Sequence, residues 1–246
     1  MTDIKNAVGV QSYCFRGFKD NAKVASLVRE IGVNKIELCG VHIDFNNEAL
    51  FDDVIATYRA AGVEIVSIGV QGFNADEANE KHWFEFARRA GAKFISAHFE
   101  PGTIPEAYRI VEKLAEKYDI RVGIHNHGGR HWLGCAQTLA WVFDNTSERI
   151  GLTLDTAWAL DSGENPVEMA ERFGKRLYGL HLKDFTFDRA RKPQDVVVGT
   201  GNLDLPGLFK VAAKVNFDGF VVIEYEGDVD NPVPALTQCV KQIKSA

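Results

Sequence analysis

The sequence predicts a single-domain (β/α)8 barrel, with the domain covering residues 1–246. Short β-type runs alternate with longer amphipathic runs along the whole chain, giving eight strand candidates and about as many helical ones. Strict alternation with short connections implies parallel strands joined by right-handed crossovers. Eight such units fit a chain of 246 residues, which is close to the usual size of this barrel.

The elements follow one another in a regular order. The predicted strands are AVGVQSY (7–13), KIELC (35–39), VEIVSIGV (63–70), KFISAHF (93–99), RVGIHNH (121–127), IGLTLD (150–155), LYGLHLK (177–183) and GFVVIEYE (219–226). Helical patterns lie between them, as at residues 47–62 and 104–118, and apolar residues of the second recur at helical spacing. Three helical segments end in glycine just before the next strand (REIGV, RAAGV, RRAGA), as left-handed C-terminal capping requires.

A doubly wound open sheet is the rival fold. Such a sheet usually carries a glycine-rich turn after its first strand. Here the first strand leads into CFRGFKD, which has no G-x-G-x-x-G pattern. No linker divides the chain, so the barrel is favoured.

Composition excludes several classes of protein. The 28 basic and 34 acidic residues give a net charge of −6, which argues against nucleic-acid binding. The four cysteines are scattered without a CxxC pair, as is common in a reducing cytosol. The N-terminus has no long apolar segment, so we expect a cytoplasmic protein without a signal peptide or membrane span. Formation of a homo-oligomer stays open.

Polar residues share one parity near the C-terminal ends of the last four strands. Side chains alternate between the barrel interior and the helices with period two, and barrel chemistry belongs at the C-terminal ends. His125, Asp155, His181 and Glu224 should therefore converge at the mouth. Two imidazoles and two carboxylates suit a divalent ion of the Mn, Fe, Co, Ni or Zn type. The alternative is that they are only hydrogen-bonded polar residues at strand ends.

Further polar residues end other strands. Glu37 and His98 lie near the C-terminal ends of the second and fourth strands. A buried unpaired carboxylate is costly, so Glu37 should face the site or a cation. His98 fits a structural role as well as a substrate-binding one. Lys183 has the same parity as His181 and is expected to stabilise developing negative charge.

Several motifs resemble one known group of proteins. IHNHG, LTLDTAW, LHLKDF, VVVGTGNLDLPGLF and GFVVIEYEGD, in this order and spacing, resemble the xylose-isomerase-like TIM-barrel superfamily. That superfamily includes sugar phosphate isomerases and epimerases, inosose dehydratases and endonuclease IV. In its epimerase branch, the resemblance implies one divalent metal held by Glu, Asp, His and Glu. Asp155, His181 and Glu224 match the last three, whereas His125 stands where those enzymes carry glutamate.

The resemblance implies a metal-dependent isomerase or epimerase acting on a keto sugar or cyclitol. Glu224 is the expected base, His125 a ligand or second base, and Lys183 the third catalytic residue. An inosose-type dehydratase is the alternative, because His-x-His-x-Gly and the EYEGD ending resemble that group and elimination needs only one base and one acid. A metal-dependent hydrolase like endonuclease IV and a non-catalytic binding protein are the remaining classes.

The substrate-binding candidates surround these residues. His127 follows His125 with the same parity, and GGRHW forms the next loop. We expect a sugar or cyclitol to contact His127, Glu37, His98, Arg130, Trp132 and Trp158. The loop after the seventh strand carries Arg189, Arg191 and Lys192, a set of side chains able to bind a phosphate group. Whether the substrate is phosphorylated stays open.

Overall fold

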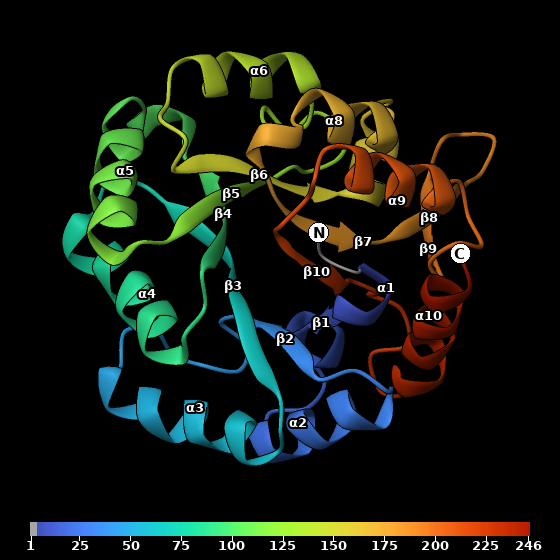
Figure 1. The fold of residues 1–246 in the computed structure, drawn as a ribbon, viewed down its shortest axis with the longest axis horizontal. Helices are drawn as coiled ribbons and strands as arrows, with labels where there is room; N and C mark the ends of the chain where they lie inside the picture. The colour runs from blue at the N-terminus through green and yellow to red at the C-terminus, as the bar shows by residue number, and fades with distance from the viewer. Residues whose placement is uncertain (1–3) are drawn as a thin grey trace.

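Eight parallel strands close into a barrel in the order β1-β10-β7-β6-β5-β4-β3-β2, and helices form a ring around it (Figure 1). This arrangement is a computed structural model that describes residues 4–246, so residues 1–3 of the predicted domain lie outside it. The barrel strands are β1 (Gly9–Gln11), β2 (Lys35–Leu38), β3 (Glu64–Phe73), β4 (Phe94–Phe99), β5 (Arg121–His125), β6 (Ile150–Asp155), β7 (Leu177–Leu182) and β10 (Phe220–Ile223). The prediction of a single-domain (β/α)8 barrel is confirmed.

Ten α-helices accompany these strands in the described part of the chain. They are α1 (Ile4–Ala7), α2 (Asn21–Glu30), α3 (Phe51–Ala60), α4 (Glu77–Ala90), α5 (Glu106–Tyr118), α6 (Ala136–Asp144), α7 (Thr156–Asp161), α8 (Pro166–Arg172), α9 (Leu205–Lys214) and α10 (Val233–Ser245). The glycines predicted to end three of them, Gly32, Gly62 and Gly91, have φ values of +85°, +68° and +83°. Left-handed backbone thus follows each of these three helices, as the sequence indicated.

The structure differs from the sequence prediction after the seventh strand. In place of a plain loop, β8 (Asp184–Phe187) and β9 (Pro193–Val196) form an antiparallel hairpin. Asp184 fastens the segment that follows it, because its carboxylate accepts hydrogen bonds from the backbone N–H groups of Gly199, Gly201 and Leu203 at 2.8–3.0 Å. The hairpin is therefore fixed beside the mouth of the barrel.

The strand register confirms the predicted alternation of side chains. Gly123 pairs with Gly151, and Asp155 pairs with His181 across the next strand boundary. A Cβ atom on Gly179 would lie 2.4 Å from the ring of Phe220, so glycine is needed there to leave space inside the barrel. The polar side chains near the C-terminal ends of the strands have the same parity as these residues, so they also face the barrel interior.

Candidate metal centre and substrate pocket

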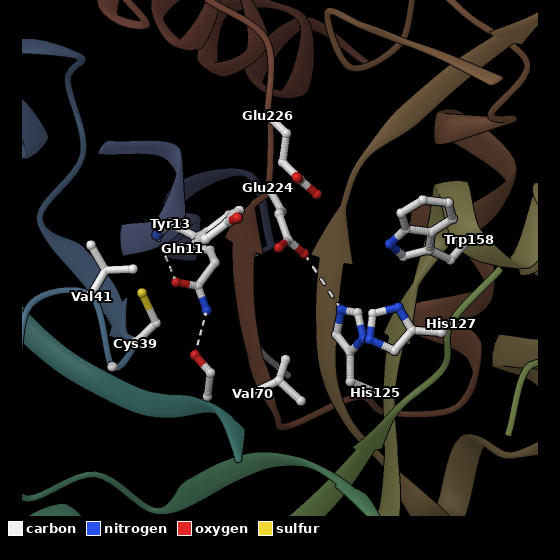
Figure 2. Close-up of a pocket in the computed structure, with 12 residues that line it drawn as sticks. Gln11, Tyr13, Cys39, Val41, Val70, His125, His127, Trp158, Glu224 and Glu226 are labelled. Atoms are coloured by element: carbon white, nitrogen blue, oxygen red, sulfur yellow. Dashed lines mark hydrogen bonds and ion pairs between the residues drawn. The ribbon is translucent and has the colours of Figure 1, made fainter. Parts of the chain in front are cut away.

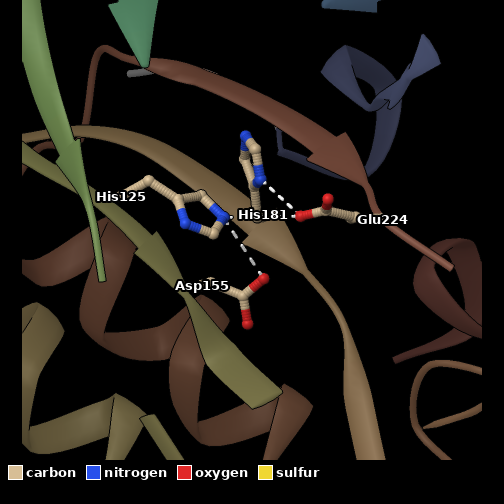
Figure 3. Close-up of side chains that lie close together, drawn as sticks. All are labelled: His125, Asp155, His181 and Glu224. Atoms are coloured by element: carbon tan, nitrogen blue, oxygen red, sulfur yellow. Dashed lines mark hydrogen bonds and ion pairs between the residues drawn. The ribbon is translucent and has the colours of Figure 1, made fainter. Parts of the chain in front are cut away.

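Four buried side chains from four neighbouring strands meet at the mouth of the barrel (Figure 3). His125 and Asp155 end β5 and β6, His181 lies within β7, and Glu224 follows β10 directly. One possible ligand atom from each residue lies within 4.8 Å of all the others. The predicted convergence of these residues is therefore what the structure shows.

The buried polar atoms of His125 and Asp155 fit a metal ion. Asp155 uses Oδ1 to accept a hydrogen bond from the backbone N–H of Trp158 at 2.8 Å, which caps α7. Its Oδ2 is buried without a hydrogen-bond partner and lies 3.5 Å from His125 Nε2. Both ring nitrogens of His125 are also buried without such partners. Leaving these atoms unpaired is costly, and a shared cation would satisfy them.

His181 is held between two carboxylates. Its Nδ1 lies 2.7 Å from Glu224 Oε2, and its Nε2 lies 2.6 Å from Glu37 Oε2. Glu37 is fully buried and accepts hydrogen bonds from Gln11, Ser67 and Ser96. Glu37 thus fixes the ring of His181 from behind, as partners of metal-binding histidines usually do, and leaves Nδ1 directed toward the cluster.

The carboxylates favour positive charge at the cluster. Burial disfavours the charged form of His181, but Glu37 and Glu224 outweigh it and raise the pKa of His181 to about 10. The pKa of His125 is likewise raised, against its burial, by Asp155 and Glu224. A divalent cation would supply the same positive charge, and two imidazoles with two carboxylates are a donor set for ions such as Mn²⁺ or Zn²⁺.

A cavity of about 470 Å³ lies above the cluster (Figure 2). His125 and Glu224 line it, together with His127, Trp158 and Glu226. The opposite wall comes from the ends of the first strands, with Gln11, Tyr13, Cys39, Val41 and Val70. Its volume lies in the range of small-molecule sites, and the cluster forms part of its floor.

Lys183 provides a buried positive charge next to this cavity. Its Nζ contacts Glu226 and lies 3.8 Å from Asp195 Oδ2 and 5.1 Å from the ring centroid of Trp158. Burial disfavours the charge, but Glu224, Asp155 and the two nearby acids raise the pKa of Lys183 above its usual value. Lys183 therefore stays protonated and suits stabilisation of negative charge.

The predicted substrate-binding residues fall in different places. His127 and Trp158 line the cavity, whereas Glu37 lies behind His181. His98 lies beside them in an adjoining hollow. Arg130 is exposed, and Trp132 packs against the hydrophobic core, so neither lines these two cavities.

Sequence reasoning overlooked three residues of the site. Gln11 donates a hydrogen bond to Glu37 at 2.8 Å and lines the cavity. It lies on the same side of the first strand as Gly9, two residues earlier, and this alternation could have identified it. Glu226 has the parity of Glu224 and was not singled out. Asp195 belongs to the hairpin, where the parity of the barrel strands gives no guidance.

The chain is similar to known proteins over most of its length. The family described as Xylose isomerase-like TIM barrel matches residues 25–244. An inosose dehydratase from Clostridium perfringens is 24% identical over 203 residues, covering 76% of this chain and 66% of that relative. The chain spans between 42% and 66% of the length of the first curated relatives it matches.

Solved structures share the fold. A sugar phosphate isomerase/epimerase from Parabacteroides distasonis has a TM-score of 0.76 at 19% identity, covering 98% of this chain and 96% of that one. The IOLI protein with a bound zinc atom has a TM-score of 0.75 at 17% identity, covering 96% and 97% of the two chains. Within residues 4–246, no helix has the length and apolarity needed to cross a membrane. The family match over residues 25–244 places this chain in the xylose isomerase-like TIM barrel family.

Proposed function

We propose that this chain is a divalent-metal-dependent enzyme that removes a proton from the carbon next to the carbonyl of a keto sugar or cyclitol. The observation that carries the proposal is the buried His125, Asp155, His181 and Glu224 cluster at the floor of a cavity. The similarity to an inosose dehydratase and to a sugar phosphate isomerase/epimerase fold supports a small polyol substrate.

A bound divalent ion would polarise the carbonyl and the neighbouring hydroxyl of the substrate. Glu224 is the proposed base, because it lines the cavity. Burial would raise the pKa of Glu224, but His181 and Lys183 outweigh burial and lower it. Glu224 is therefore ionised and able to accept a proton near neutral pH. Lys183, which is buried beside the cavity and contacts Glu226, would favour negative charge that develops on the substrate without lining the cavity itself.

Two fates of the substrate follow from this step. Isomerisation or epimerisation returns the proton to carbon. His125, which also lines the cavity, is the proposed second group in this proton transfer. Glu224 Oε2 and His125 Nε2 are only 3.4 Å apart, so they approach the substrate from one side, which favours transfer between adjacent carbons over inversion at one carbon. Elimination of water is the second candidate, supported by the inosose dehydratase relatives.

The lining of the cavity favours an unphosphorylated substrate. Glu224 and Glu226 line it, and no lysine or arginine does so among the described residues. Arg189, Arg191 and Lys192 lie instead in the exposed turn between β8 and β9, where Arg191 contacts the carbonyl of Leu160 at 3.3 Å. Residues 4–246 contain one group of side chains that could hold a metal ion. This favours a single bound ion over the larger metal cluster of an enzyme like endonuclease IV.

The test is a panel of keto sugars and inososes followed by NMR in D2O with Mn²⁺ present. Deuterium incorporation without loss of water indicates an isomerase or epimerase, and a new enone or diketone indicates a dehydratase. Stripping the metal with a chelator should stop either reaction, and Mn²⁺ should restore it. If no member of the panel exchanges a proton with metal bound, the proposed function is wrong.

A further inference from the structure

A second hollow adjoins the substrate cavity. It has a volume of about 360 Å³ and is lined by His98, His127, Gly128, His131 and Trp158. His127 and Trp158 line both spaces, so the two lie side by side at the mouth of the barrel. A ligand that extends from the metal cluster past these two rings would enter the hollow.

The rings of the hollow are held in place by the surrounding structure. The indole of Trp158 packs edge-on against Phe185 with ring centroids 5.0 Å apart. A Cβ atom on Gly128 would lie 2.3 Å from the Trp158 ring, so glycine is needed to admit it. The backbone N–H of Trp158 binds Asp155, which ties this wall to the metal cluster. The wall is thus formed before any ligand arrives.

The polar atoms of the hollow suit hydroxyl groups. His131 Nδ1 accepts a hydrogen bond from the backbone N–H of Leu133 at 3.2 Å, so the proton of its neutral ring sits on Nε2 and is available as a donor. His127 contributes a second imidazole, with its ring centroid 5.2 Å from that of His131. Neither a carboxylate nor a lysine or arginine lines the hollow within residues 4–246, although Glu100 contacts His98 at 3.2 Å.

An indole face beside imidazole rings matches a sugar ring, which offers C–H groups for stacking and hydroxyls for hydrogen bonds. A phosphate group would require a cation. We propose that the hollow is a subsite for a second pyranose ring, so that the substrate is a keto sugar carried within a disaccharide. This inference rests on the proposed function, which places the reacting ring over the metal cluster.

The test measures binding without turnover. The Mn²⁺-loaded protein is titrated with glucose, cellobiose and maltose, and saturation-transfer NMR identifies which ring of each disaccharide contacts the protein. At least one disaccharide should bind more tightly than glucose, with contacts to both rings. His131→Ala should weaken that disaccharide roughly twofold to tenfold, as expected for one lost hydrogen bond, and leave the affinity for glucose unchanged.

Matched variants separate a direct contact from a loss of structure. His131→Gln keeps a hydrogen-bonding group and should retain part of the disaccharide preference. His82→Ala, which removes an imidazole from α4 that pairs with Glu48 outside the cavities, should have no effect. The inference is overturned if no disaccharide binds more tightly than glucose, or if His131→Ala weakens glucose equally. Failure of the proposed function would appear separately, as absence of proton exchange in D2O.

Discussion

The two ends of the barrel interior differ sharply in chemistry although the same strands build both. At the N-terminal end, Phe94, Tyr178, Phe220 and Val222 form a buried apolar cluster, with the Phe94 and Phe220 rings 5.4 Å apart. At the C-terminal end, the same interior is filled by the His125, Asp155, His181 and Glu224 cluster. Along β10 and the residue that follows it, the change occurs over four positions, from Phe220 to Glu224.

The layer between these ends shows what the difference means. Ser67, Ser96 and Gln11 direct their donors to Glu37, and Ser96 also lies 3.2 Å from Thr153 Oγ1. Polar groups in this layer therefore satisfy one another. At the mouth, by contrast, both ring nitrogens of His125 and Oδ2 of Asp155 are buried without a hydrogen-bond partner. The apolar end contributes stability, and the mouth gives up stability for a binding site.

The largest expected effect is at the mouth. Glu224→Gln removes the proposed base while keeping the size of the side chain, so the rate of proton exchange should fall by about 10²–10⁴-fold. Deuterium incorporation into the substrate in D2O measures this rate. An unchanged rate would exclude Glu224 as the base and direct attention to His125.

The matching change at the opposite end should affect stability instead. Phe94→Ala removes a large buried ring, and the free energy of unfolding should fall by about 3–5 kcal/mol. Denaturant titration measures this loss. The Mn²⁺ stoichiometry of the folded variant should match that of wild type, and loss of the ion from folded protein would show that the two ends are not independent.

A change in the middle layer should act through His181. Glu37→Gln removes the charge that faces His181 Nε2, and the affinity for Mn²⁺ should fall by about 10–100-fold, as for other partners of metal-binding histidines. Ser67→Ala is the control, because it removes one donor and leaves the Glu37 charge in place. Equal effects of both variants on Mn²⁺ affinity would argue that the layer acts only through packing.

A further effect concerns pH. Burial raises the pKa of Asp195 to about 7, above its ordinary value of 3.8. The folded protein thus binds more protons than the unfolded chain between these values, so stability should fall as pH rises through this window. Relative to Asp195→Asn, wild type should lose about 1.4 kcal/mol for each unit of pKa difference. Denaturant titrations at pH 5 and pH 8 test this, and a constant difference between the two proteins would contradict the raised pKa.

Much of this organisation follows from the sequence because it depends on periodicity. Alternation along a strand is enough to place His125, Asp155, His181 and Glu224 on one side, and parallel strands bring their ends together. The helix-ending glycines, such as Gly91, follow from the need for left-handed backbone.

The remaining features depend on three-dimensional geometry that the periodicity of the sequence does not predict. Glu37 has interior parity, but the register of β2 shifts after Ile36, and its side chain meets His181 from behind. Arg130 and Trp132 lie in a loop, where spacing along the chain does not determine direction. Asp195 reaches Lys183 only because a hairpin forms after β7.

The most direct test is the metal content of the mouth. Isothermal titration with Mn²⁺ should show one ion per chain for wild type, and elemental analysis of protein purified without chelator should agree. The double variant His125→Ala with Asp155→Ala removes the unpaired buried atoms and should abolish that binding, while Phe94→Leu at the other end should retain it. A wild-type protein that binds no divalent ion, or a double variant that binds Mn²⁺ as tightly as wild type, would contradict a metal centre at this end of the barrel.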